Sequence, residues 1–158
     1  MSKTKTVDDQ VLKFHKQIVE LIKKYQFRDR KHITCCGVSV SQCYILETLN
    51  THGALTMNEL AEKMYLSIST VTRVVEELVK KGYAQREEDP ADRRIRVIDL
   101  TDEGKVVYDK CWSNVFESEK AILANFPPTQ RDTLINFLMQ LNRAVNEWQS
   151  CCAVSEEV

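Results

Sequence analysis

Two short helical segments followed directly by a hairpin pattern constrain the fold of this 158-residue chain more than any other feature. Across residues 56–65 and 67–82, apolar residues recur every three or four positions, which is the period of an α-helix. Residues 83–100 then change to a polar stretch, a turn at Asp89-Pro90-Ala91-Asp92 and a run of β-branched residues. This order of elements predicts a winged helix-turn-helix with a two-stranded wing.

Both short helices carry local signals for where they begin and end. Thr56-Met57-Asn58-Glu59 matches a capping box, in which the hydroxyl and the carboxylate satisfy each other's backbone donors. Ser67 or Ser69 can cap the second helix, and Gly82 suits the turn that follows it. The predicted buried face of the second helix consists of Val71, Val74, Val75, Leu78 and Val79.

Further helices are predicted before this core. A first helix runs from about residue 8 to about residue 28 with one apolar stripe, and a charged break over residues 28–31 ends it. Residues 34–41 have turn chemistry, with Ser41 placed to cap a helix over about residues 42–50.

Two long helices are predicted after the hairpin. Thr101-Asp102-Glu103 opens the first of them, and Pro127-Pro128 separates it from a last helix capped by Thr129 and Asp132. The last helix has a heptad-like seam that suits pairing with another helix, formed by Leu134, Leu138, Leu141, Val145 and Trp148. The fold class is therefore mainly α with a small β-hairpin wing, in a single domain over residues 1–158.

Composition narrows the class of protein. The net charge of -1 hides an uneven distribution, because a basic N-terminal region and an acidic C-terminal region offset each other. No apolar run approaches the ~20 residues that a membrane span needs, and Asp8 and Asp9 stand where a signal peptide would be apolar. We expect a cytoplasmic protein whose 6 cysteines are mostly thiols, and no contact with a membrane.

The second short helix and the hairpin carry the residue types that bind double-stranded DNA. Small hydroxyl side chains that can donate to phosphates crowd the start of the helix, namely Ser67, Ser69, Thr70 and Thr72. Arg73 can reach a guanine edge with two hydrogen bonds, and Arg86 can touch the DNA backbone. Arg93 and Arg94, next to Asp92, place cations at a hairpin tip thin enough for a minor groove.

The stretch from residue 60 to residue 105 closely resembles the MarR family of bacterial regulators. The resemblance is carried by Leu66-Ser67-Ile68-Ser69-Thr70-Val71-Thr72-Arg73, Leu78-Val79-Lys80-Lys81-Gly82-Tyr83, Asp89-Pro90-Ala91-Asp92-Arg93-Arg94 and Leu100-Thr101-Asp102-Glu103-Gly104-Lys105. The flanking helices also fit, so the likeness covers nearly the whole chain.

The resemblance implies an intertwined homodimer that binds near-palindromic operator DNA, usually as a repressor. It implies dimerisation helices at about 8–30 and 101–150, and a DNA-binding lobe at about 41–100. It also implies that Arg73 is the main base reader, and that Asp92 orients a wing arginine, most readily Arg94, into the minor groove. Such proteins place a small effector between the dimer helices and the lobe, which here are joined by residues 31–41.

The joining segment is rich in cysteine. Cys35, Cys36 and Cys43 are candidate ligands for a soft metal ion or candidate sites of thiol oxidation, and Cys151 and Cys152 form a second pair. The spacing matches no zinc-finger pattern, and an organic effector or purely structural thiols explain the same residues. Cys111 is predicted to lie in the core. No cofactor is required for DNA binding.

Two other classes of function remain open from the residues alone. A cysteine-dependent thiol enzyme needs a thiol within hydrogen-bond reach of a histidine, and 3 histidines are present. A dimeric protein-interaction module without DNA affinity would keep the helices, although the basic wing tip argues against it.

Overall fold

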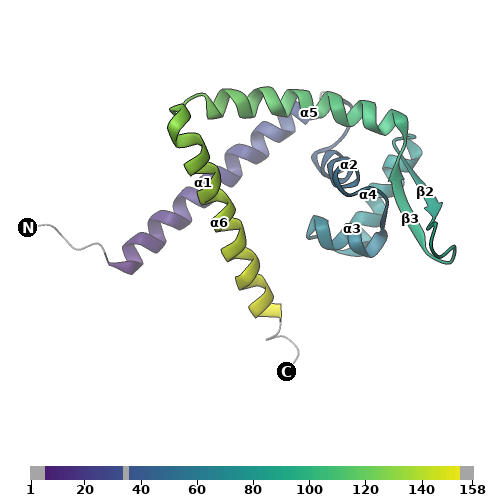
Figure 1. Ribbon diagram of the computed structural model, residues 1–158, viewed down its shortest axis with the longest axis horizontal. Helices are drawn as coiled ribbons and strands as arrows, with labels where there is room; N and C mark the ends of the chain where they lie inside the picture. Colours follow the sequence, from purple (N-terminus) through teal and green to yellow (C-terminus); the bar gives the residue numbers. More distant parts are fainter. Residues whose placement is uncertain (1–5, 34–35, 154–158) are drawn as a thin grey trace, which may run out of the picture. The chain divides into compact units, whose positions relative to one another are not determined.

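The computed structural model describes residues 6–33 and 36–153, with side chains as far as residue 149. The chain divides into two compact units, residues 1–115 and 116–158. In chain order, the elements are α1 (Val7–Ile33), α2 (Val40–His52), β1 (Leu55–Thr56), α3 (Met57–Met64), α4 (Ile68–Lys80), β2 (Ala84–Glu88), β3 (Arg96–Leu100), α5 (Asp102–Leu123) and α6 (Pro128–Ala153) (Figure 1). The predicted order of helices and hairpin is confirmed.

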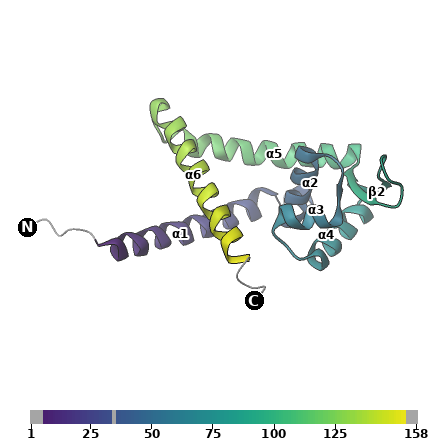
Figure 2. The same ribbon diagram turned by 60° about the horizontal axis from the view of Figure 1, so that its bottom comes forward.

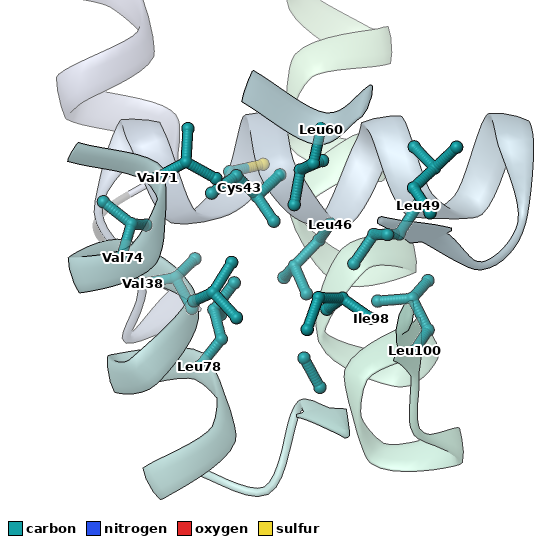
Figure 3. Close-up of a cluster of buried hydrophobic side chains, with 14 of the residues drawn as sticks. Val38, Cys43, Leu46, Leu49, Leu60, Val71, Val74, Leu78, Ile98 and Leu100 are labelled. Carbon is teal, nitrogen blue, oxygen red and sulfur yellow. The ribbon is translucent and has the colours of Figure 1, made fainter. Parts of the chain in front are cut away.

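The core of the first unit lies among α2, α3, α4 and the sheet. Figure 3 shows Val71 and Leu78 of α4 on the side of that helix that faces Leu46 of α2 and Ile98 of β3, and Val74 belongs to the same buried cluster. Four of the five residues predicted for the buried face of α4 are buried. The exception is Val79, which is 36% exposed because it lies at the edge of the apolar stripe in the last turn of the helix.

The sheet has three strands in the order β1-β3-β2, all antiparallel. The hairpin pairs Ala84 with Leu100 and Glu88 with Arg96, so its tip lies over residues 89–95, close to the predicted tip. β1 was not predicted, because two residues are too short for any periodicity. It pairs Leu55 with Ile98 and joins the helical core to the wing.

The first helix is longer than predicted, because the charged run at residues 28–31 does not end it. Asp29 is only 4% exposed, and both Nε and Nη2 of Arg28 donate to its Oδ1, at 2.9 and 2.6 Å. The hydroxyl of Tyr44, from α2, donates to Asp29 Oδ2. The Arg28 guanidinium also lies 4.2 Å from the ring centroid of Tyr25. Partners from within and beyond the helix thus allow the charged run to stay helical as far as Ile33.

The second helix begins earlier than predicted, with Ser39 and not Ser41 as its cap. The backbone N–H of Gln42 donates to Ser39 Oγ at 3.2 Å, and the side-chain oxygen of Gln42 accepts from the Ser39 N–H at 3.1 Å. This is a complete capping box. The box predicted at Thr56 and Glu59 is confirmed.

The start of α5 packs against the backbone that leads into β2. Gly104 is buried, and a Cβ atom at this position would lie 1.9 Å from the Tyr83 carbonyl oxygen. The Thr101 hydroxyl donates to the Gly82 carbonyl at 2.6 Å and accepts from the Gly104 N–H at 3.0 Å. Glycine is required here for close approach, not for an unusual backbone angle.

The second unit contains the end of α5 and all of α6. The last helix begins at Pro128, whose ring suits a first helical position, rather than after the predicted caps Thr129 and Asp132. Its side chains include large exposed apolar residues, among them Ile135, Phe137, Leu138, Val145 and Trp148. In the part of the chain that the structure describes, no helix is long and apolar enough to cross a membrane.

Candidate nucleic-acid interface

The two faces of α4 differ sharply. Val71, Val74, Val75 and Leu78 point into the core, whereas Ile68, Ser69, Arg73 and Glu76 are exposed. Arg73 therefore lies on the outer face, as the sequence predicted. Figure 2 shows α4 beside α3 in the lobe that also carries β2.

The hydroxyl groups at the start of α4 hold the helix end together. Ser67 is the N-cap, and its Oγ accepts from the Thr70 N–H at 3.3 Å. The same Oγ lies 3.1 Å from Ser69 Oγ and 2.8 Å from Thr70 Oγ1. Thr72 Oγ1 donates to the Ile68 carbonyl at 2.7 Å. Donation from these four hydroxyls to phosphates stays a prediction, and it competes with these internal bonds.

The turn between α3 and α4 exposes an aromatic residue that the sequence analysis did not single out. Tyr65 caps α3 in the left-handed conformation, with φ 52°, and is 75% exposed. Its N–H donates to the Glu62 carbonyl at 3.1 Å, and the Leu66 N–H donates to the Ala61 carbonyl at 3.1 Å. The signal available from sequence was a large aromatic at the center of a helix-turn-helix turn.

The wing tip holds its arginines outward. Asp89 Oδ1 accepts from the N–H groups of Ala91 and Asp92, at 2.7 and 3.2 Å. Asp92 Oδ1 accepts from the Arg94 N–H at 3.0 Å and lies 3.4 Å from Arg94 Nε. The Arg94 side chain is 93% exposed. Arg93 is exposed beside it.

The first strand of the wing reaches the outer face of α4. Arg86 Nη2 lies 3.9 Å from Glu76 Oε1, with both side chains about half exposed. The predicted DNA-contacting residues of α4 and of the wing thus lie on elements that are linked at the surface of one unit. At this separation and exposure the ion pair is weak, so Arg86 remains available to a phosphate.

Lys81 is held on a different side of α4. Its ammonium donates to the Gly37 carbonyl and to the Gln42 side-chain oxygen, both at 2.9 Å. The Gln42 side-chain nitrogen donates to Glu77 Oε2 at 2.7 Å. These bonds connect the segment before α2 with the end of α4.

The structure describes three cysteines as thiols, Cys36, Cys43 and Cys111. Cys111 is fully buried, as predicted, and is hydrogen-bonded to Cys43. Burial raises the pKa of the Cys43 thiol to about 11, although the bond with Cys111 opposes the rise. Cys36 is half-buried and accepts a hydrogen bond from Asn114 Nδ2 at 3.6 Å.

The other thiol candidates lie outside the described side chains: Cys35, Cys151 and Cys152. Among the side chains that are described, no group of three His, Cys, Asp or Glu is spaced to hold a metal ion. The predicted soft-metal set of Cys35, Cys36 and Cys43 includes one residue beyond that description and stays a prediction.

Asp29, which was predicted to be part of a break, is buried next to partly exposed polar groups. Burial, followed by the hydrogen bond to Asp29, raises the pKa of Tyr44. Burial, followed by repulsion from Asp29, raises the pKa of the half-buried Glu47. Burial also raises the pKa of Tyr108 on α5.

Comparison with known proteins identifies the family. The sequence model of the MarR family matches residues 38–95. The HTH-type transcriptional regulator YfiV of Bacillus subtilis (strain 168) is 31% identical over 108 residues, which is 68% of either chain. This chain belongs to the MarR family of transcriptional regulators.

Other known proteins are also similar to this chain. The HTH-type transcriptional repressor MdtR of Bacillus subtilis (strain 168) is 34% identical over 90 residues, 57% of this chain and 56% of that repressor. A MarR family protein from Bacillus stearothermophilus has a TM-score of 0.81 at 22% identity, over 89% of this chain and 99% of that one. A cysteine-to-serine mutant of MarR from E. coli was solved in complex with operator DNA. Its TM-score is 0.71 at 19% identity, and the match covers 86% of this chain and 98% of that one. Both solved structures share the winged helix-turn-helix fold.

Proposed function

We propose that this MarR-family chain is a cytoplasmic homodimer that binds double-stranded operator DNA and represses transcription until a small effector releases it. The observation that carries the proposal is the placement of two arginines. Arg73 stands on the exposed face of α4, and Arg94 stands outward at the wing tip, paired with Asp92. With α4 in the major groove, Arg73 would face the base edges, and Arg94 at the wing tip would reach the adjacent minor groove.

The relatives support two parts of this proposal, repression and operator binding. The likeness to MdtR, a repressor, favours repression, and the E. coli MarR protein of similar fold was solved with operator DNA. A two-fold dimer must set its recognition helices about one duplex turn apart, ~34 Å.

The exposed apolar side chains of the long helices support the dimer. α1 exposes Val11, Leu12, Phe14, Leu21 and Ile22, and α6 exposes Ile135, Phe137, Leu138, Val145 and Trp148. Helices with so much exposed apolar surface suit burial against a second copy of the chain.

The test is fluorescence anisotropy on labelled DNA from upstream of the chain's own gene, against a scrambled duplex, at near-physiological salt. We expect a preference of about a thousandfold for the upstream DNA. Arg73→Ala should cost about ten- to a hundredfold in operator affinity and reduce the preference, because a base contact is lost. Arg94→Ala should also weaken operator binding.

Lys110→Ala is the matched control, since it removes an exposed cation of α5 and should leave the preference unchanged. Equal binding of the wild-type chain to both duplexes would count against the proposal, unless an effector restores the difference. Unchanged operator binding by both arginine variants would refute the assignment of the interface.

The effector is proposed to act on residues 31–41, as a soft metal ion, a thiol oxidant or an organic molecule. The bond from Lys81 to the Gly37 carbonyl supports this, because it connects that segment to the end of α4. Gln42, next to the segment, also bonds Lys81 and Glu77. In the same assay, replacing Cys35, Cys36 and Cys43 by serine should abolish release by a metal or oxidant and spare DNA affinity. Continued release by the metal or oxidant would show that these three thiols do not sense it. The raised pKa of Cys43 argues against a thiol enzyme that uses this cysteine as its nucleophile.

A further inference from the structure

The outer face of α4 begins with an apolar side chain. Ile68 is the first residue of the helix, and it is 50% exposed. Thr72 lies one turn further along the same face, and Arg73 follows it. Ile68 lies at the edge of the core-facing stripe, one turn before Val71, and it is not among the buried residues of the core.

The polar atoms near Ile68 are already engaged within the helix end. The Thr72 hydroxyl donates its proton to the Ile68 carbonyl at 2.7 Å, which turns the oxygen toward the backbone. Because its hydroxyl proton is engaged, the apolar group that Thr72 can offer is its methyl. Ser67 and Thr70 share the bonds of the N-cap. Ile68 and Thr72, one turn apart, thus offer an aliphatic surface at the start of α4.

The edges of the base pairs contain one aliphatic group in the major groove, the 5-methyl of thymine. We propose that Ile68, together with the Thr72 methyl, reads thymine methyl groups in each operator half-site. This inference rests on the proposed function, since it names what one part of the DNA-binding face selects. The surface is committed to DNA because Arg73 directly follows Thr72, and because Glu76, one turn after Thr72, lies 3.9 Å from Arg86 of the wing.

The experiment starts from a random duplex library, from which the wild-type protein selects its own half-site. We expect thymine to be enriched in the selected half-site. Each thymine is then replaced by uracil, which removes the methyl group and leaves base pairing intact. At one position or more, affinity should fall about fourfold per half-site, the factor associated with burial of one methyl group.

The Ile68→Ala variant tests whether Ile68 is the residue that contacts the thymine methyl group. It should bind the thymine operator about fourfold per half-site more weakly and should no longer distinguish thymine from uracil at that position. Val79→Ala is the matched control, because it trims an exposed β-branched residue three turns along the same helix. It should keep the full thymine preference. The uracil series on wild-type protein does not depend on the folding of any variant.

The possible failures are distinguishable. If the selection enriches no sequence, both this inference and the proposed function are overturned. If a sequence is enriched but no uracil replacement changes affinity, the inference alone is overturned. A thymine preference that persists in Ile68→Ala overturns it too, since another residue then reads the methyl. Unchanged DNA binding by Ile68→Ala would likewise overturn the inference, since Ile68 would then make no contact that contributes to affinity.

Discussion

Gly104 shows how one residue fixes the geometry between the wing and the helix that follows it. A Cβ at this position would lie 1.9 Å from the Tyr83 carbonyl oxygen. Because this oxygen belongs to the backbone, no change of side-chain rotamer can relieve the clash. Gly104→Ala should therefore force α5 away from Tyr83 and lower the free energy of unfolding by about 2–3 kcal/mol. Urea unfolding at fixed protein concentration measures this loss.

Gly53→Ala is the informative comparison at the same scale. Gly53 has φ +76°, but an added Cβ would meet nothing within 4 Å. Only backbone strain is expected there, costing about 1–3 kcal/mol, because a ψ of −158° at this φ is essentially confined to glycine. A Gly104→Ala variant as stable as the wild type would show that contact with Tyr83 is not the reason for glycine at position 104.

At the scale of elements, Gln42 connects three parts of the lobe. Its side chain is 2% exposed and bonds Ser39, Lys81 and Glu77. Gln42→Ala should lower the free energy of unfolding by about 1–2 kcal/mol, because a buried side chain that makes three hydrogen bonds and half of a capping box are lost. The same substitution at Gln85, which is exposed, should cost less than about 0.5 kcal/mol. Similar losses in the two variants, again by urea unfolding, would contradict this role.

The sequence was most informative where local chemistry decides an element, and least where a distant partner does. The period of α4 and the box at Thr56 predicted those helices, but a serine–glutamine box at Ser39 was overlooked in favour of Ser41. The length of α1 could not be predicted, because Asp29 is stabilised by Tyr44, fifteen positions away. Likewise, the hydroxyls of α4 suggested phosphate donors, and only the structure shows their mutual bonds.

The whole molecule needs a second copy to engage two half-sites, and α6 provides the place to test this. We expect the purified chain to have twice its 18.3 kDa mass in sedimentation equilibrium. Leu138 is one of the exposed apolar residues of α6. Leu138→Asp should yield monomers, because burying an unpaired carboxylate in the dimer interface is costly. A monomer can place only one α4 helix on the operator, so operator affinity should fall a hundredfold or more.

Val79→Asp is the control for this change, because it places the same charge on an exposed apolar site of the DNA-binding lobe. It should keep the dimer mass. Monomeric Leu138→Asp with wild-type operator affinity would show that one copy suffices, and the pairing of two α4 helices on one duplex would then be wrong. A dimeric Leu138→Asp with wild-type affinity would instead move the interface away from this part of α6. The mass therefore tests whether α6 forms the dimer interface, and the affinity tests whether operator binding requires two copies of the chain.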